Sequence, residues 1–201
     1  MLSSLAPRLS AIAPVTSIAI YTPDADTWQT LVKATRQLGK LTQREPQAEQ
    51  LIRLSTARLA GYNAALRQQA ARKGQSPLPL LMVQFMDDRH VRIFGDNSLF
   101  QAVIERMGID NAWQGDTNAW GFALVGIEAL ARYPDATLVI VDPLPAGVEA
   151  QLEKSGLWQQ MPSVQHGHLL RLPPVWSFGA LPSAQRFARE MTSALNAQGA
   201  H

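Results

Sequence analysis

The chain has 201 residues and a formal net charge of +2; 46% of its residues are hydrophobic and 17% are charged. This length and composition allow a substantial hydrophobic core, and so small a net charge gives no support for binding to nucleic acid. There is no cysteine, which excludes disulfides, thiolate catalysis and zinc sites with cysteine ligands.

The first part of the chain predicts a short helix, a strand and a second helix. Residues 5–13 favour a helix with Pro7 in its first turn, and residues 17–21 have the composition of a strand. Acceptor side chains in residues 23–26 can open the next helix, and Gly39 is expected to close it.

The longest predicted element is a helix over residues 46–73. Thr42 and Glu45 have the spacing of a capping box, and Gly74 stands where a C-terminal cap is expected. At about 1.5 Å of rise per residue the helix would extend about 42 Å, well beyond the usual globular helix of about 11–12 residues. A helix this long with one apolar face either belongs to a bundle or connects two lobes.

Beyond residue 74 the pattern changes to mixed α/β. The run at residues 137–141 is almost wholly apolar, as is typical of a strand covered on both faces. The expected elements are strands at 78–85 and 90–94 around a turn at 87–89, a helix from its cap at 97–98 to 107, a loop at 113–121, a helix at 128–133, the strand at 137–141, a helix at 146–154, a strand at 168–172 and a helix at 182–195.

Two tryptophans, Trp120 and Trp176, lie in stretches with neither helical nor strand period. Their surroundings, residues 115–121 and 173–179, are rich in residues that form turns. A large aromatic side chain on a loop packs either against the protein's own core or against a ligand. One such tryptophan would favour core packing. Two in similar settings, with Phe178 close to the second, favour an aromatic-lined pocket.

No catalytic residue and no metal site is predicted from motifs. The phosphate-binding and dinucleotide-binding glycine loops are absent, and Ser177 matches only the end of a Gly-x-Ser-x-Gly elbow. His166 and His168 could share one face of a strand and hold a metal. With Gly167 between them and no acidic or cysteine partner evident, they are better explained as a turn.

Four segments of the second half share their order and spacing with one known family. Together they resemble the periplasmic iron(III)-hydroxamate siderophore-binding proteins of ABC importers, and the likeness is continuous from about residue 79 to 195. Residues 1–73 match more loosely. The segments are residues 94–100, 108–115, 117–121 and 174–176.

This resemblance implies an α/β fold of two lobes joined by one long helix, with the ligand in a shallow cleft between the lobes. The chain would comprise a remnant of the N-terminal lobe (1–41), the connecting helix (42–74) and the C-terminal α/β lobe (75–201), with the N-terminal lobe largely absent. The protein would be periplasmic, and its signal sequence would lie outside this chain.

The resemblance also implies five ligand-binding residues. Trp120 and Trp176 correspond to the two tryptophans of the family's cleft. Phe178 stands where relatives often have tyrosine, so a hydroxyl contact would be lost, and Ser177 replaces a more usual aromatic residue. Asn118 matches a polar position near the ligand.

The implied partners are a ferric hydroxamate siderophore and the inner-membrane ABC permease. Glu128 matches the acidic residue that docks on arginines of the permease, although a solvated carboxylate in a first helical turn would look the same. The chelator's oxygens already fill the coordination shell of iron(III), so no cofactor and no protein metal ligand is needed. Because the family's hydroxamate-binding arginine and tyrosine would precede Met1, the chain alone is expected to bind ferric hydroxamates weakly or not at all.

Three alternatives stay open at this stage. A binding protein of the same class could carry a catecholate siderophore, haem or cobalamin. A serine hydrolase could use Ser177 with His166 or His168. A cytosolic interaction module could self-associate through the long helix and the face exposed by a missing lobe.

Overall fold

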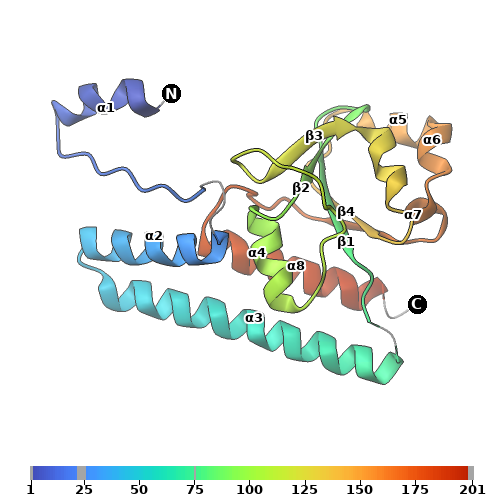
Figure 1. The fold of residues 1–201 in the computed structure, drawn as a ribbon, viewed down its shortest axis with the longest axis horizontal. Helices are drawn as coiled ribbons and strands as arrows, with labels where there is room; N and C mark the ends of the chain where they lie inside the picture. Colours follow the sequence, from blue (N-terminus) through green and yellow to red (C-terminus); the bar gives the residue numbers. More distant parts are fainter. Residues whose placement is uncertain (1, 22–25, 75, 199–201) are drawn as a thin grey trace.

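The structure is a computed structural model, and it describes residues 2–21, 26–74 and 76–198. At its centre is a five-stranded sheet in the order β3-β2-β1-β4-β5, with helices on both faces (Figure 1). The predicted α/β class is confirmed. The strands are β1 (Leu80–Phe85), β2 (His90–Phe94), β3 (Phe122–Gly126), β4 (Thr137–Val141) and β5 (Leu169–Leu172). The helices are α1 (Leu2–Ser10), α2 (Thr27–Leu41), α3 (Glu45–Lys73), α4 (Leu99–Met107), the 3-10 helix η1 (Ile127–Arg132), α5 (Val148–Lys154), α6 (Gly156–Gln159), α7 (Pro162–Gln165) and α8 (Leu181–Gln198).

The sheet is mixed. Strand β4 pairs in parallel with both β1 and β5, whereas β2 is antiparallel to β1 and to β3. The carboxyl ends of β1, β4 and β5 therefore meet at one edge, which we call the carboxyl edge. Open α/β sheets bind their ligands outside such an edge. All five residues of β4 are buried, as its apolar run predicts.

A hydrophobic cluster covers each face of the sheet. On one face Phe100 of α4 packs between Phe94 and Phe187, with ring centroids 4.7 and 4.4 Å apart. On the other face the ring of Phe85 lies 5.9 Å from that of Trp158. Aromatic pairs at these separations add to the stabilisation from burial alone, so both helical layers are fixed to the sheet.

The long helix α3 forms as predicted. It ends at Gly74, whose φ of 64° provides a left-handed C-terminal cap. Its buried side chains Ile52, Leu59 and Leu66 belong to the same cluster as those of α4 and α8. The apolar face of α3 is therefore covered by the sheet-bound helices.

Helix α2 runs alongside α3 (Figure 1) and adds Trp28 and Leu31 to this cluster. Helices α2 and α3 thus share a core with the sheet layer, and the division into 1–41, 42–74 and 75–201 stays a prediction. Among the described residues, no helix combines the length and apolarity needed to cross a bilayer.

Residues 17–21 are not a strand. They form an extended segment outside the sheet. A strand needs a neighbour to satisfy its backbone groups, and none of the five strands pairs with this segment. Tyr21 at its end packs instead against aromatic rings from later loops.

The predicted boundary between α2 and α3 is also wrong in detail. Helix α2 continues beyond Gly39, which is buried where α3 approaches; a Cβ added to it would lie 2.6 Å from the Cβ of Ala48. Thr42 and Glu45 do not form a capping box, because the Thr42 hydroxyl donates to the carbonyl of Leu38 at 2.8 Å and so closes α2.

Smaller differences concern element ends. Of the predicted acceptors, Asp26 caps α2 by accepting from the amide of Gln29 at 3.1 Å, while residues 22–25 lie outside the described part of the chain. The helix expected at 128–133 is the 3-10 helix η1, and the helix expected at 5–13 is α1. Strand β3 is missing from the sequence prediction because its short apolar run follows a loop directly.

Candidate functional site

The loop before β3 presents Trp120 to solvent. The side-chain oxygen of Asn118 accepts from the amide of Trp120 at 2.9 Å, and the amide of Asn118 donates to the carbonyl of Phe122 at 3.0 Å. Gly121 has a φ of 79°, and a Cβ on it would lie 2.6 Å from the Cα of Ser98. The turn is therefore tight, and it leaves Trp120 55% exposed. Asn118 supports the tryptophan through the backbone of the loop.

Asn97 ties this loop to the start of α4. Its side-chain amide donates to the carbonyl of Asn118 at 2.9 Å, and its side-chain oxygen accepts from the hydroxyl of Thr117 at 2.5 Å. Its own carbonyl accepts from the hydroxyl of Thr27 in α2 at 2.9 Å. The position of Trp120 is therefore coupled to two helices.

The loop after β5 presents Trp176. Val175 and Ser177 are buried on either side of it, whereas Trp176 is 72% exposed. The amide of Gly179 donates to the carbonyl of Trp176 at 3.2 Å, which closes a turn. The hydroxyl of Tyr21 donates to the carbonyl of Gly179 at 2.7 Å and anchors that turn.

Four rings from three distant segments meet here, and we call them the aromatic cluster: Tyr21, Trp120, Phe122 and Phe178. The ring of Phe178 lies 5.6 Å from that of Trp120, 6.0 Å from that of Phe122 and 6.2 Å from that of Tyr21. Trp120 and Tyr21 are 6.3 Å apart. Trp120 is therefore not packed into the core, and it contacts Phe178 of the second loop, whereas Trp176 is not part of the cluster.

Trp176 and Phe178 line a hollow of about 410 Å³ at the carboxyl edge. We call it the Trp176 hollow. It contains one charged side chain, Arg92 of β2, whose guanidinium carbon lies 4.8 Å from the ring centre of Phe122. The other lining residues are Gln84, Phe85, Met86, Pro143, Pro145, Val175 and Ser177.

Sequence reasoning missed both Tyr21 and Arg92. Tyr21 lies in the segment expected to be a strand, and nothing local indicates its contacts. For Arg92 a signal was available, because strand alternation places it on the same face as Phe94, where an apolar residue would be usual.

Ser177 is buried, and its hydroxyl lies 3.4 Å from the side-chain oxygen of Gln84. His168 directly precedes β5, whereas Ser177 follows its other end. The structure therefore does not bring Ser177 together with His166 or His168 for hydrolysis. Across the described ranges, no three His, Asp or Glu side chains converge in a way that could hold a metal ion.

Glu128 is exposed in the first turn of η1, at the end of β3 remote from Trp120. Its carboxylate folds back over Gly126. Glu128 is thus separated from Trp120 by the length of β3.

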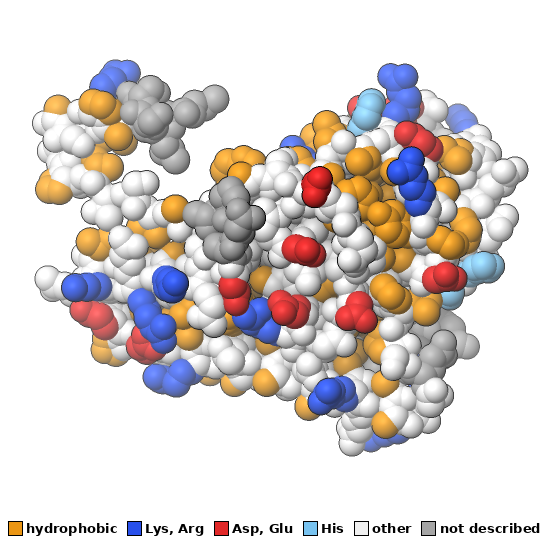
Figure 2. All heavy atoms as spheres, in the orientation of Figure 1, with side chains coloured by type: hydrophobic (Ala, Val, Ile, Leu, Met, Phe, Trp, Pro, Cys, Tyr) orange, Lys and Arg blue, Asp and Glu red, His pale blue; other side chains and the backbone are white. Residues whose placement is uncertain are grey.

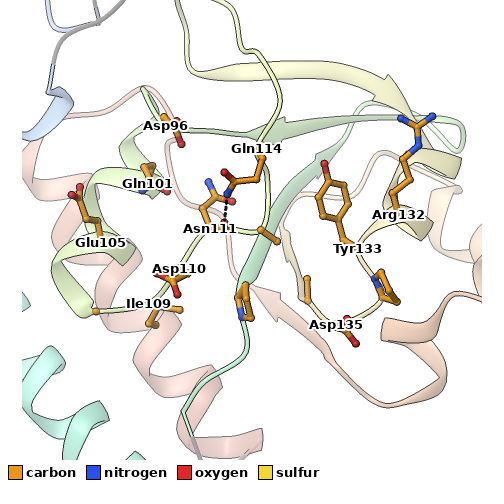
Figure 3. A pocket seen from close by; sticks show the side chains of 15 residues that line it. Asp96, Gln101, Glu105, Ile109, Asp110, Asn111, Gln114, Arg132, Tyr133 and Asp135 are labelled. Carbon is orange, nitrogen blue, oxygen red and sulfur yellow. Dashed lines mark hydrogen bonds between the residues drawn. The ribbon is translucent and has the colours of Figure 1, made fainter.

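A larger hollow, of about 740 Å³, lies elsewhere, where β1 and β4 begin. Figure 3 shows Asp96, Glu105 and Asp110 on one side of it and Arg132 and Tyr133 on the other. Neither Trp120 nor Trp176 lines this hollow.

The sequence profile of the periplasmic binding protein family matches residues 6–175, and the chain belongs to that family. It is 43% identical over 117 residues to the iron(3+)-hydroxamate-binding protein FhuD of Escherichia coli (strain K12). That alignment covers 58% of this chain and 40% of FhuD, so the chain spans less than half the length of this curated relative.

Solved structures share the fold. The siderophore-binding protein FhuD from Vibrio cholerae, in complex with Fe3+-Desferal, superposes with a TM-score of 0.86 at 24% identity, covering 96% of this chain and 70% of that one. The periplasmic catecholate-siderophore-binding protein VctP from Vibrio cholerae superposes with a TM-score of 0.65 at 21% identity, covering 97% and 68%. The resemblance deduced from the sequence is confirmed at the level of the family.

Proposed function

We propose that this chain is the substrate-binding component of an ABC importer and that it binds ferric hydroxamate siderophores in the periplasm. The observation that carries the proposal is the aromatic cluster, in which Trp120 contacts Phe178 while most of its indole faces water. Similarity to FhuD of Escherichia coli supports hydroxamate as the chelating group.

The chemistry of such a ligand suits this surface. Three hydroxamates fill the six coordination positions of iron(III), so the metal is transported within its chelator and needs no ligand from the protein. What remains to be recognised is a compact, partly apolar shell. Burying exposed indole surface against it stabilises the complex by about 25 cal/mol per Å² of apolar area. We assign this contact to Trp120, Trp176 and Phe178, with Asn118 and Ser177 supporting the two loops.

We further propose that the loaded protein docks on the inner-membrane permease through Glu128. Two features of Glu128 support this proposal: it is exposed, and it is separate from the aromatic cluster. A docking group must stay accessible while the ligand is bound. No resident cofactor enters this scheme.

The proposal can be tested by NMR with gallium(III)-substituted ferrichrome, since gallium(III) has the charge and coordination of iron(III) but is diamagnetic. The chain has five tryptophans, and single Trp→Phe variants assign their indole N–H signals. We expect the signals of Trp120 and Trp176 to shift during titration while that of Trp158, buried on the other face of the sheet, stays in place. Binding should be weaker than about 1 μM, the range of a complex with few polar contacts.

W120A and W176A should each weaken binding about tenfold or more, as expected for aromatic residues that dominate an interface. W158F is the matched control and should bind as the unmodified chain does. Unchanged Trp120 and Trp176 signals at millimolar ligand would exclude the proposed site.

A catecholate siderophore is the second candidate. The fold likeness to VctP supports it, as does the presence of a guanidinium in the Trp176 hollow. The gallium(III) complex of a tris-catecholate, titrated in the same way, would have to bind more tightly than gallium(III)-ferrichrome to replace hydroxamate as the ligand class.

A further inference from the structure

Arg92 lies beside the aromatic cluster. It lies in the middle of β2, where it pairs with Gln84 of β1 and with Leu124 of β3. Directly paired residues point to the same face of a sheet, so these three side chains form a row next to Phe122. The guanidinium stacks 4.8 Å above the Phe122 ring, an arrangement that favours arginine over lysine.

The charge of Arg92 has no acidic partner within the described residues, since none of the salt bridges found there involves it. Arg106 makes the informative comparison. Its guanidinium also stacks on an aromatic ring, that of Trp28 at 4.8 Å, but it is neutralised by Asp26 and Glu105, each at 3.7 Å.

Arg92 is also only partly hydrated. The side chain is half-buried and is the one charged group among the described residues that line the Trp176 hollow. Asp87, in the hairpin turn that precedes β2, accepts instead from the amide of Arg89 and from His90. A partly dehydrated guanidinium interacts more strongly with an anion than a fully solvated one does.

We propose that Arg92 makes this site selective for the charge of the chelate, favouring ferric hydroxamates that carry a carboxylate or other negative group on their periphery. The inference rests on the proposed function. Three hydroxamate anions cancel the charge of iron(III), so the core of such a ligand is neutral and the preference acts on its outer groups. Arg92 is thus a specificity-determining residue that contacts the ligand next to the indoles.

Three gallium(III) complexes of desferrioxamine separate charge from chelation. The terminal amine left free gives a net charge of +1, acetylation gives 0 and succinylation gives −1, around one unchanged hydroxamate core. We expect the dissociation constant to decrease as the net charge of the complex goes from +1 through 0 to −1. The overall decrease should be roughly tenfold, for charges that meet in a partly hydrated site. Raising the salt concentration from about 20 mM to about 500 mM should compress that range.

R92Q should remove the difference in dissociation constant among the three complexes, whatever it does to the affinity they share, and R92K should keep part of that difference. R89Q is the matched control: it removes the same charge from an exposed position of the same hairpin, outside the hollow, and should keep the full order. Circular dichroism checks that each variant is folded.

The outcomes are distinct. If none of the three complexes binds, the proposed function fails and this inference with it. If all three bind equally well, or if R92Q keeps the order, the role of Arg92 alone is overturned. If R92Q does not fold, the role of Arg92 is tested by comparing the unmodified chain with R92K. The comparison uses the order of the three dissociation constants and their dependence on salt.

Discussion

Gly121 closes the loop that presents Trp120, and we expect Gly121→Ala to destabilise the protein by about 2–5 kcal/mol. Its φ of 79° costs an L-residue about 1–2 kcal/mol. The added Cβ would lie 2.6 Å from the Cα of Ser98 and 2.9 Å from the carbonyl carbon of Asn97. These are backbone atoms at the start of α4, so the loop or the helix must shift, which adds about 1–3 kcal/mol.

Gly61→Ala is the matched control. Gly61 is exposed inside α3, and a Cβ on it would meet no atom within 4 Å. Alanine there should stabilise the protein by about 0.5–1 kcal/mol. Urea unfolding followed by circular dichroism measures both variants, and the Trp120 indole signal should move only in G121A. A loss below about 1 kcal/mol for G121A would refute the tight packing of this loop.

Three further outcomes are expected. Leu59→Ala should lower the free energy of unfolding in urea by about 2–5 kcal/mol, because Leu59 is 1% exposed between α3 and the sheet-bound helices. Leu54→Ala, at an exposed position of the same helix, should lower it by less than about 0.5 kcal/mol. Equal losses in the two variants would contradict the shared core. The amide of Arg89 holds the pKa of Asp87 below its usual value, so the ionised carboxylate stabilises the folded protein above about pH 4, and this contribution is lost as the pH falls. D87N should therefore make the free energy of unfolding depend less on pH in the acid range. Unfolding curves at several pH values measure this, and a pH profile equal to that of the unmodified chain would contradict it. Exposed apolar side chains in residues 5–15 favour self-association, so the apparent mass in light scattering should rise with concentration rather than stay constant.

Elements with local signals could be predicted from the sequence. Helix α4 is one of them: Ser98 caps it by accepting from the amide of Gln101 at 3.0 Å, and Gly108 ends it with a φ of 75°. Cap, apolar period and stop all lie within one short stretch, so no tertiary information is needed. The long helix α3 was predictable from its length and its stop at Gly74, and β4 from its apolar run.

Features set by distant contacts could not be predicted. Gly39 looks like a helix stop, yet it is retained inside α2 because Ala48 approaches it. Residues 17–21 have the composition of a strand, but pairing is a property of the sheet, and no strand borders them. The candidate site combines both cases: its two tryptophans stand out locally, whereas their neighbours come from remote parts of the chain.

Tyr21 shows why the site does not lie within residues 75–201 alone. Burial raises the pKa of its phenol, so the hydroxyl remains a donor throughout the physiological range and its bond to the Gly179 carbonyl does not switch with pH. That carbonyl belongs to the turn that presents Trp176, and the Tyr21 ring contacts Trp120. One residue from the first part of the chain therefore contacts both tryptophan loops, and under the proposed function this preorganisation would lower the ordering cost of binding.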